Sequence, residues 1–300
     1  MRRSTSILAA LVSSACFGTL AVFTSLAYER GALPLQLLSW RFFLAAVLLG
    51  GYLAVTDPRK LRAPFGDVGR YAVISIAGYG AASICFFFAL TYADAGVVSI
   101  LLYTYPAMVV LAERLLFGVP LDAGRAGALG LTFVGCTLVV APFTGDVHVG
   151  LPGVALGLGA AAAYTLFGMV SHRRLPGRPR TTLMVYLFFF TSLMAGAAAL
   201  LTSTPLGVGD WDAVTWALLG GIVLLPTFIA ILLYLRAIHG LGAGQAAIVS
   251  TFEPVFTIAM AALLLGEKLA PIQIAGAACV LCGVVVAERS GRTAEEPAIV

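Results

Sequence analysis

Long apolar runs separated by short polar turns fill this chain almost from end to end. Each run is about as long as the roughly 20 residues that a helix needs to cross the hydrocarbon core of a bilayer. Charged residues make up only 11% of the sequence, whereas a typical soluble domain has about 25%. Because so few charges cannot cover a water-exposed surface, the sequence predicts an integral membrane protein.

Turns rich in Gly, Pro and Asp divide the chain into ten apolar segments. A membrane-spanning β-barrel would need strands of about 10 residues with alternating polarity, and these long unbroken runs do not fit that pattern. We therefore expect an all-α fold in which ten transmembrane helices cover residues 5–28, 34–55, 68–92, 95–116, 121–141, 149–171, 181–202, 212–235, 243–265 and 270–288.

Basic residues are distributed unequally between the predicted loops. If the chain crosses the membrane at every apolar run, fifteen of its eighteen Lys and Arg residues lie on the same side of the membrane as the two termini. Only Arg30 and Lys268 fall on the other side, and Arg41 lies inside the second helix. Because basic loops favour the cytoplasmic side, we expect both termini in the cytoplasm. The first run is longer than the apolar part of a signal peptide, so it is expected to remain as the first span.

The chain resembles itself at a constant offset of 148 residues, which relates the midspan prolines Pro106 and Pro254. Each half then contains five predicted helices, and an odd number places the halves in opposite orientations. Such inverted repeats are a common plan among transporters. The expected repeats span residues 5–141 and 149–288, and a cytoplasmic tail spans 289–300.

Glu253 lies about ten residues into the ninth predicted helix, near the bilayer midplane. Ser250 and Thr257 share its helical face by their spacing, and Pro254 frees a backbone carbonyl beside it. Ionisable groups inside a bilayer are costly and usually functional. Two interpretations stay open: a carboxylate that lines a transport path and senses a proton or an amine, or a structural carboxylate beside a kink.

Aromatic and hydroxyl side chains recur at a similar depth in several predicted helices. Together they would form an apolar wall with polar handles, suited to a zwitterion with an apolar side chain. Ordinary packing is the alternative for each residue alone. The candidate substrate-binding set comprises Phe17, Tyr79, Ser83, Tyr103, Tyr164 and Phe167, with Ser250, Glu253 and Thr257.

Gly78 and Pro226 are also related by the repeat offset, and each weakens a helix near its middle. We expect these helices to bend there during gating, and we include Pro106 and Pro254 among the gating positions. Arg41 lies roughly 10 Å below the end of the second helix by helical rise. For this residue the sequence favours a structural ion pair, or a side chain that reaches outward, over contact with a substrate.

A motif in the last two predicted helices is shared with a known family. Glu253-Pro254-Val255-Phe256 is followed by Leu263-Leu264-Leu265-Gly266-Glu267-Lys268, and Gly276 and Gly283 come after it. This pattern resembles the EamA repeat of the drug/metabolite transporter superfamily, with a weaker copy from Tyr105-Pro106 to Gly118. Arg41 matches an arginine often found in the second helix of that family. The chain departs from it at Cys16-Phe17-Gly18, where Trp-Gly is frequent, and at Val119, where a glutamate is usual.

The resemblance implies a ten-helix exporter of metabolites in the bacterial inner membrane, most similar to the aromatic amino-acid exporter subgroup. Its partners would be a small-molecule substrate and the lipid bilayer, with no nucleic acid and no cofactor. Protons through Glu253 are a candidate for coupling, and facilitated efflux is equally compatible. The chain contains no G-x-x-x-x-G-K-[ST] motif, so ATP is not expected to drive it directly. The Cys279-x-x-Cys282 pair lies in an apolar run without a nearby histidine, which favours packing over metal binding.

Three other functions remain as alternatives. Efflux of cationic drugs would use Glu253 as its acidic group. Exchange of phosphorylated sugars or nucleotide-sugars needs buried cations for the phosphate, and only Arg41 is available. The sequence Gly207-Val208-Gly209-Asp210 is similar to a motif of intramembrane aspartyl proteases, but that chemistry requires two aspartates at membrane depth. We therefore expect the chain not to be an enzyme.

Overall fold

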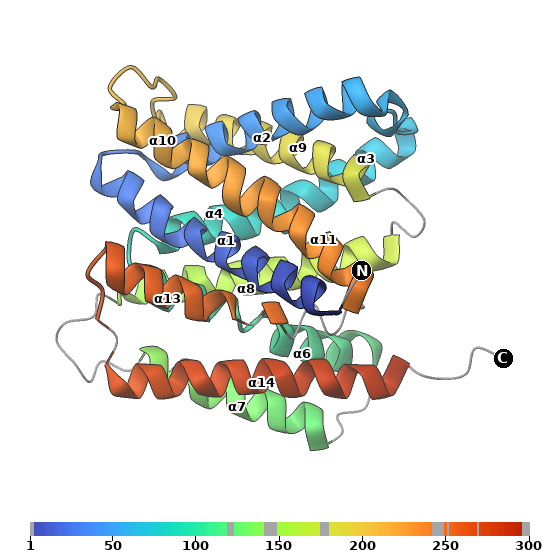
Figure 1. Cartoon of the computed structure of the whole chain (residues 1–300), viewed down its shortest axis with the longest axis vertical. Helices are drawn as coiled ribbons and strands as arrows, with labels where there is room; N and C mark the ends of the chain where they lie inside the picture. The colour runs from blue at the N-terminus through green and yellow to red at the C-terminus, as the bar shows by residue number, and fades with distance from the viewer. Residues whose placement is uncertain are drawn as a thin grey trace.

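The computed structural model describes residues 3–118, 123–140, 149–174, 180–241, 249–250, 252–268 and 270–295. These residues are helical almost throughout, and the helices pack into a layered bundle (Figure 1). Within them the only β-type pairing is an isolated antiparallel bridge between Ala93 and Val149. The expected all-α architecture is confirmed over this part of the chain.

The elements of the first half follow the predicted segments closely. They are α1 (Arg3–Glu29), α2 (Pro34–Thr56), the short 3-10 helix η1 (Pro58–Leu61), α3 (Phe65–Val73), the π-helix η2 (Ile74–Gly80), α4 (Ala81–Ala89), α5 (Ala95–Leu102), α6 (Tyr105–Phe117) and α7 (Ala123–Val140).

The second half repeats this order. Its elements are α8 (Leu151–Arg174), α9 (Arg180–Leu201), α10 (Ala213–Ile222), the π-helix η3 (Val223–Ile229), α11 (Ala230–Leu241), α13 (Glu253–Leu264) and α14 (Pro271–Glu295).

Within the described residues, six helical stretches are long and apolar enough to cross a membrane, and one of them combines α5 and α6. Four further apolar helices are shorter within the described residues, so a total of ten crossings stays a prediction. The six are Ser4–Glu29, Pro34–Thr56, Gly66–Ala89, Ala95–Leu116, Thr181–Leu201 and Ala213–Tyr234, and the shorter helices are Ala126–Leu138, Leu151–Phe167, Glu253–Leu264 and Pro271–Val286.

The two π-helical segments occur at matching positions of the two halves. Gly78 lies in η2 and Pro226 lies in η3. Proline has no N–H to bond the carbonyl four residues earlier, which here is the carbonyl of Ile222. The hydroxyl of Thr227 donates to that carbonyl at 3.0 Å, so the lost backbone bond is replaced locally. Both helices thus depart from regular α-helical geometry where bending was expected, and the gating motion itself remains a prediction.

Two predicted continuous helices differ from the structure around their prolines. The run 95–116 is interrupted, because α5 ends at Leu102 and α6 begins at Tyr105. Residues 243–248 and 251 of the run 243–265 lie outside the described part, and α13 begins at Glu253. Pro254 therefore occupies the first turn of a helix, where a missing N–H costs nothing, instead of kinking a helix in its middle. Glu253 is consequently the first residue of α13.

The repeat-related helices α2 and α9 lie side by side and run in opposite directions. The Thr182 hydroxyl at the start of α9 donates to the Lys60 carbonyl just beyond the end of α2, at 2.8 Å. At the other end, the Trp40 indole of α2 donates to the Leu206 carbonyl beyond α9 at 3.0 Å. An inverted relation between the two halves requires this antiparallel packing.

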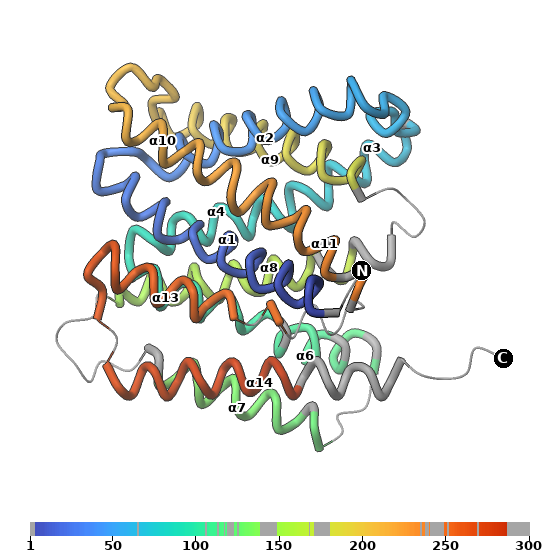
Figure 2. Tube along the Cα trace, viewed as in Figure 1, coloured from blue at the N-terminus to red at the C-terminus, as the bar shows by residue number. Residues whose placement is uncertain are grey.

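The second pair of repeat-related helices, α7 and α14, packs in the same way and forms one edge of the bundle (Figure 2). A Cβ atom on Gly135 would lie 2.7 Å from the carbonyl oxygen of Gly276, and one on Gly283 would lie 3.0 Å from that of Ala128. Glycine at both positions lets the two backbones approach closely, as small residues commonly do between membrane helices.

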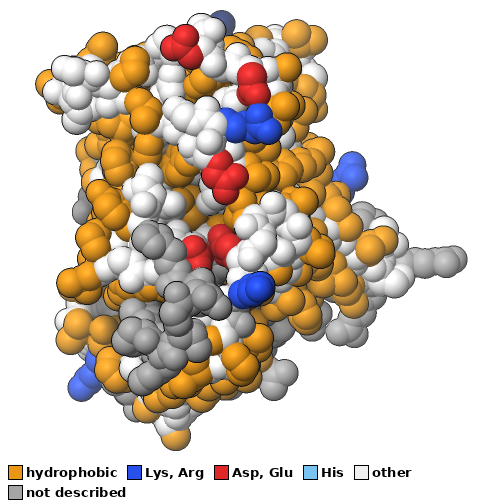
Figure 3. Space-filling model, turned by 90° about the vertical axis from the view of Figure 1, so that its left-hand side faces the viewer, with side chains coloured by type: hydrophobic (Ala, Val, Ile, Leu, Met, Phe, Trp, Pro, Cys, Tyr) orange, Lys and Arg blue, Asp and Glu red, His pale blue; other side chains and the backbone are white. Residues whose placement is uncertain are grey.

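Charged side chains gather in a band across the end of the bundle where α1 ends and α10 begins, with hydrophobic side chains on both flanks (Figure 3). Arg30 and Asp212 form an ion pair at 2.7 Å there. Asp212 also caps α10, because its carboxylate accepts from the Thr215 backbone N–H at 2.7 Å. Trp211 and Trp216 are in edge-to-face contact beside it, 5.5 Å apart, as expected for indoles at a membrane interface.

Glu267 connects the two halves at this same end. Its carboxylate oxygens accept from the backbone N–H groups of Ala95 and Gly96, at 2.8 and 3.1 Å, and so cap α5. Burial raises the pKa of Glu267 above its ordinary value, while the hydrogen bonds from Gly96 and Ala95 partly counter this.

We predict that the wild type loses thermal stability relative to Glu267→Gln as the pH rises. The loss should begin near the ordinary pKa of a carboxyl group and be complete above the raised pKa of Glu267. A raised pKa in the folded state means that protonation favours folding, and this contribution is lost as the group ionises. The difference is measured by thermal unfolding of both proteins in detergent. The pH values run from about 4, near the ordinary pKa of glutamate, to about 7. A wild type that gains stability relative to the variant with rising pH would contradict the assignment.

Candidate functional site

The two halves meet through a contact between Tyr103 and Glu253. The Tyr103 hydroxyl lies 2.8 Å from Oε2 of Glu253 and 2.9 Å from the carbonyl oxygen of Ser250. Tyr103 is buried and follows the last residue of α5, whereas Glu253 begins α13. The contact therefore lies where the predicted helices 95–116 and 243–265 are interrupted. It joins three of the candidate site residues, Tyr103, Ser250 and Glu253.

A row of aromatic rings continues from this contact through Tyr105. The Tyr105 ring centroid lies 6.2 Å from that of Tyr103 and 5.0 Å from that of Tyr164. Tyr164 contacts Phe167 at 5.9 Å, and Phe167 contacts Tyr79 at 5.4 Å. The structure thus brings four predicted residues into one row: Tyr79 from η2, Tyr103 just after α5, and Tyr164 and Phe167 from α8.

Tyr105 is the link that sequence reasoning missed. The repeat offset of 148 residues places it opposite Glu253, and this relation could have identified it. Its backbone carbonyl accepts from the Thr165 hydroxyl at 3.1 Å, which holds the start of α6 against α8.

The aromatic row ends at Arg41 on α2. Tyr79 contacts Phe42 at 5.7 Å between ring centroids, and the Arg41 guanidinium lies 4.8 Å from the Phe42 centroid and 5.6 Å from that of Phe87. The Tyr79 hydroxyl also interacts with this guanidinium. Sequence reasoning expected a structural ion pair for Arg41, but no carboxylate pairs with it among the described residues.

Thr257 connects the site to α1. Its hydroxyl lies 3.1 Å from the carbonyl oxygen of Glu253 and 3.3 Å from that of Gly18. A Cβ atom on Gly18 would lie 3.1 Å from the Thr257 nitrogen, so a glycine allows α1 and α13 to touch. Ser250 keeps its place in the site through its carbonyl, although it lies before the start of α13 and does not share a continuous helix with Glu253.

The remaining predicted residues lie around this core. Phe17 is half-buried on α1 next to Gly18, and Ser83 is buried on α4; neither joins the described ring contacts or hydrogen bonds of the site. Gly78 packs against Phe167, because a Cβ atom there would lie 2.9 Å from the Phe167 Cβ. Pro106 follows Tyr105 in the first turn of α6.

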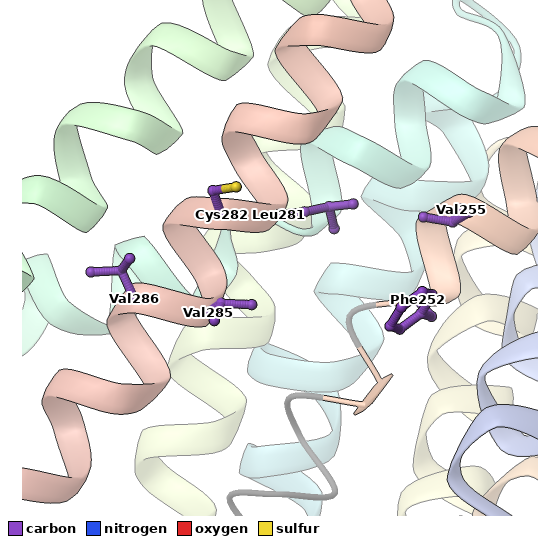
Figure 4. A pocket seen from close by; sticks show the side chains of 6 residues that line it. All are labelled: Phe252, Val255, Leu281, Cys282, Val285 and Val286. Carbon is purple, nitrogen blue, oxygen red and sulfur yellow. The ribbon is translucent and has the colours of Figure 1, made fainter. Parts of the chain in front are cut away.

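An apolar groove lies outside this site, between α13 and α14 (Figure 4). Its lining is almost entirely apolar and includes none of the predicted site residues. The groove is lined by Phe252, Val255, Leu281, Cys282, Val285 and Val286.

Metal binding has no support in the described residues. No three His, Cys, Asp or Glu side chains lie close enough there to hold an ion, and all five cysteines are unpaired. The chemistry that the site offers is recognition by one carboxyl group, several phenolic hydroxyls and aromatic faces.

Apolar helices in two oppositely oriented sets around a polar and aromatic centre are typical of membrane transporters. The family model described as "EamA-like transporter family" matches the chain twice, over residues 4–141 and 151–288. The chain belongs to this family, and the resemblance noted in the sequence is confirmed at that level.

Relatives of this chain carry the same general description. An uncharacterized transporter of Synechocystis sp. is 30% identical over 64% of this chain and 58% of its own length. The uncharacterized transporter YcbK of Bacillus subtilis is 26% identical over 89% of this chain and 87% of its own. A crystal structure that covers 98% of this chain and 99% of its own has a TM-score of 0.65 at 19% identity, which shows a shared fold.

Proposed function

We propose that the chain exports amino acids, preferably aromatic and other apolar ones, or similar small metabolites across the bacterial inner membrane by alternating access. Ten helices would cross the membrane with both termini in the cytoplasm. The observation that carries this proposal is the contact between Tyr103 and Glu253, which joins the two repeats beside an aromatic row. An amino acid offers a charged amine for the carboxylate and an apolar side chain for the rings.

The position of this contact supports alternating access. Transporters with inverted repeats commonly bind substrate near the midplane, where helices are interrupted, and expose it by moving one bundle against the other. Here α5 and α6 are separated at Tyr103–Thr104, and α13 begins at Glu253. A substrate that competes for Glu253 would loosen the link between the halves and permit that motion.

Hydrogen-bond counting supports protons as a coupling ion. The Tyr103 hydroxyl has one hydrogen to donate, yet both of its neighbours are acceptors while the Glu253 carboxylate is ionised. A protonated Glu253 would donate to Tyr103, and Tyr103 would then donate to the Ser250 carbonyl. Protonation thus satisfies every atom of the contact when no substrate is bound.

Efflux from proteoliposomes tests the proposal. Purified protein reconstituted with internal radiolabelled amino acids should release L-phenylalanine, L-tryptophan or L-leucine faster than empty liposomes. A lipophilic cation in the same panel tests the alternative of drug efflux, for which Glu253 would be the binding carboxylate. Release of the cation alone, or of no amino acid, would contradict the proposed substrate class.

The aromatic row makes its own prediction. Tyr79→Ala and Tyr103→Ala should each raise the apparent KM for L-phenylalanine by about two- to tenfold, because an aromatic contact is worth about 0.5–1.5 kcal/mol beyond its buried area. Tyr52→Ala is the matched control, because Tyr52 is 62% exposed and lies away from the row. An unchanged KM in both site variants would remove these residues from the substrate path.

A further inference from the structure

Arg41 is a buried cation that has no acidic partner among the described residues. The residue is 4% exposed, and its Nε atom has no hydrogen-bond partner in the described part of the chain. The ion pairs found there involve Arg30, Lys60 and Arg70 instead. The neighbours of Arg41 include the rings of Phe42 and Phe87 and the hydroxyl of Tyr79.

These neighbours compensate a guanidinium only in part. A cation above an aromatic ring gains about 2 kcal/mol when both are desolvated, and a phenol supplies one neutral acceptor. A guanidinium has five N–H donors in a planar fork that matches a carboxylate. Charged side chains inside membrane proteins are usually paired or face the transported species. The described neighbours therefore leave the charge of Arg41 only partly balanced, and an anion would balance it.

The opposite end of the aromatic row carries the opposite charge. Arg41 lies over the ring of Phe42, which contacts Tyr79. The row of ring contacts then runs to Tyr103, which contacts Glu253. The two charged groups are not copies of one another, because the repeat offset places Phe189 at the position of Arg41 and Tyr105 at that of Glu253. The scaffold is thus duplicated while its two charges are confined to one half each.

We propose that Arg41 is a binding residue for the carboxylate of the transported solute. The rings of Phe42, Tyr79 and Phe167 contact the apolar part of that solute, and its amine faces the Glu253 end. This inference rests on the proposed function and narrows it: the preferred substrates are zwitterions with an apolar body, and simple amines lacking a carboxylate are poor substrates. A free inorganic anion is the other source of negative charge that could occupy Arg41.

A ligand series combined with an Arg41 variant tests the assignment. Three ligands share the same apolar body. L-phenylalanine carries an amine and a carboxylate, phenethylamine carries only the amine, and 3-phenylpropionate carries only the carboxylate. Binding is measured by ligand-induced thermal stabilisation of the purified protein and by inhibition of phenylalanine efflux. For the wild type we expect L-phenylalanine to bind at least about 30-fold more tightly than phenethylamine, the lower end of the effect of removing one partner of a buried charge pair.

Arg41→Gln should remove this discrimination by weakening L-phenylalanine binding while leaving phenethylamine within about threefold, a change near 0.6 kcal/mol. Arg41→Lys should retain part of it, since the charge remains without the planar fork. Arg70→Gln is the matched control, because the Arg70 side chain is 61% exposed, and it should behave as the wild type. If Arg41→Gln does not fold, the wild-type ligand series and Arg41→Lys still decide the question.

Several outcomes would overturn the inference. Equal binding of L-phenylalanine and phenethylamine by the wild type would show that no cation recognises the carboxylate. Equal weakening of both ligands by Arg41→Gln would assign Arg41 to structure. Competition by chloride alone, without discrimination among the organic ligands, would make Arg41 an inorganic anion site. If amino-acid efflux persists in any of these cases, the proposed function is still supported. A wild type that binds none of the three ligands would contradict both the proposed function and the role of Arg41.

Discussion

Replacing Glu253 by glutamine is expected to uncouple transport from the proton gradient. Glutamine preserves the size of the side chain and an acceptor for the Tyr103 hydroxyl, but it cannot release a proton. In proteoliposomes, an imposed gradient of one pH unit should stimulate phenylalanine efflux by up to about tenfold in the wild type, because one coupled proton supplies about 1.4 kcal/mol per pH unit. The same gradient should not stimulate the variant. Efflux rates with and without the gradient give the comparison directly.

Two controls separate this effect from misfolding. Glu29→Gln alters an exposed carboxylate at the end of α1 and should leave the stimulation unchanged. Tyr103→Phe removes the hydroxyl that contacts Glu253 but keeps the ring, so it should reduce coupling less than Glu253→Gln. Full stimulation in Glu253→Gln would show that this carboxyl group is structural and that protons, where they are used, travel elsewhere.

Gly135→Leu is expected to have the largest effect on stability. A Cβ atom at this position would meet the Gly276 carbonyl and the Val280 backbone nitrogen, both at 2.7 Å. Backbone atoms cannot rotate away, so α7 must separate from α14. Overpacking costs about 1–3 kcal/mol, and a leucine against backbone should reach or exceed the upper end. Thermal unfolding in detergent and the fraction of monodisperse protein measure the loss.

Gly130→Leu is the matched control on the same helix. A Cβ atom there meets nothing within 4 Å, and Gly130 is exposed. This variant replaces the same residue type in the same helix without touching α14, so it should be neutral or slightly stabilising. Because leucine favours a helix more than glycine does, comparable losses in the two variants would mean that the contact between α7 and α14 does not determine the effect.

The architecture could be predicted from the sequence because lipid imposes a simple rule on it. A backbone inside a bilayer must satisfy its own hydrogen bonds, so long apolar runs become helices, and most of their boundaries agree with the structure within a few residues. The interruption at Tyr103–Thr104 could not be recognised in this way. Both residues are compatible with a helix, and only Pro106 nearby marks the position.

The site was predicted in part for a different reason. Glu253, Tyr103 and Tyr164 stand out as polar or phenolic residues at membrane depth, and this is a property of the sequence alone. The position of Arg41 at the other end of the same row depends on how α2 packs against η2 and α4, which periodicity does not specify. A structural ion pair was therefore the natural expectation for Arg41 until its neighbours could be identified.

The opposed orientation of the two halves is tested most directly by labelling Arg59 and Gly207, which are repeat-equivalent positions 148 residues apart. Both lie in exposed connections between helices. Single cysteines are introduced there in a background without the five native cysteines, and intact cells are treated with a membrane-impermeant maleimide. We predict that residue 207 is labelled from outside and that residue 59 is labelled only after the membrane is opened. Labelling of both positions from the same side would contradict an inverted repeat and the transport mechanism built on it.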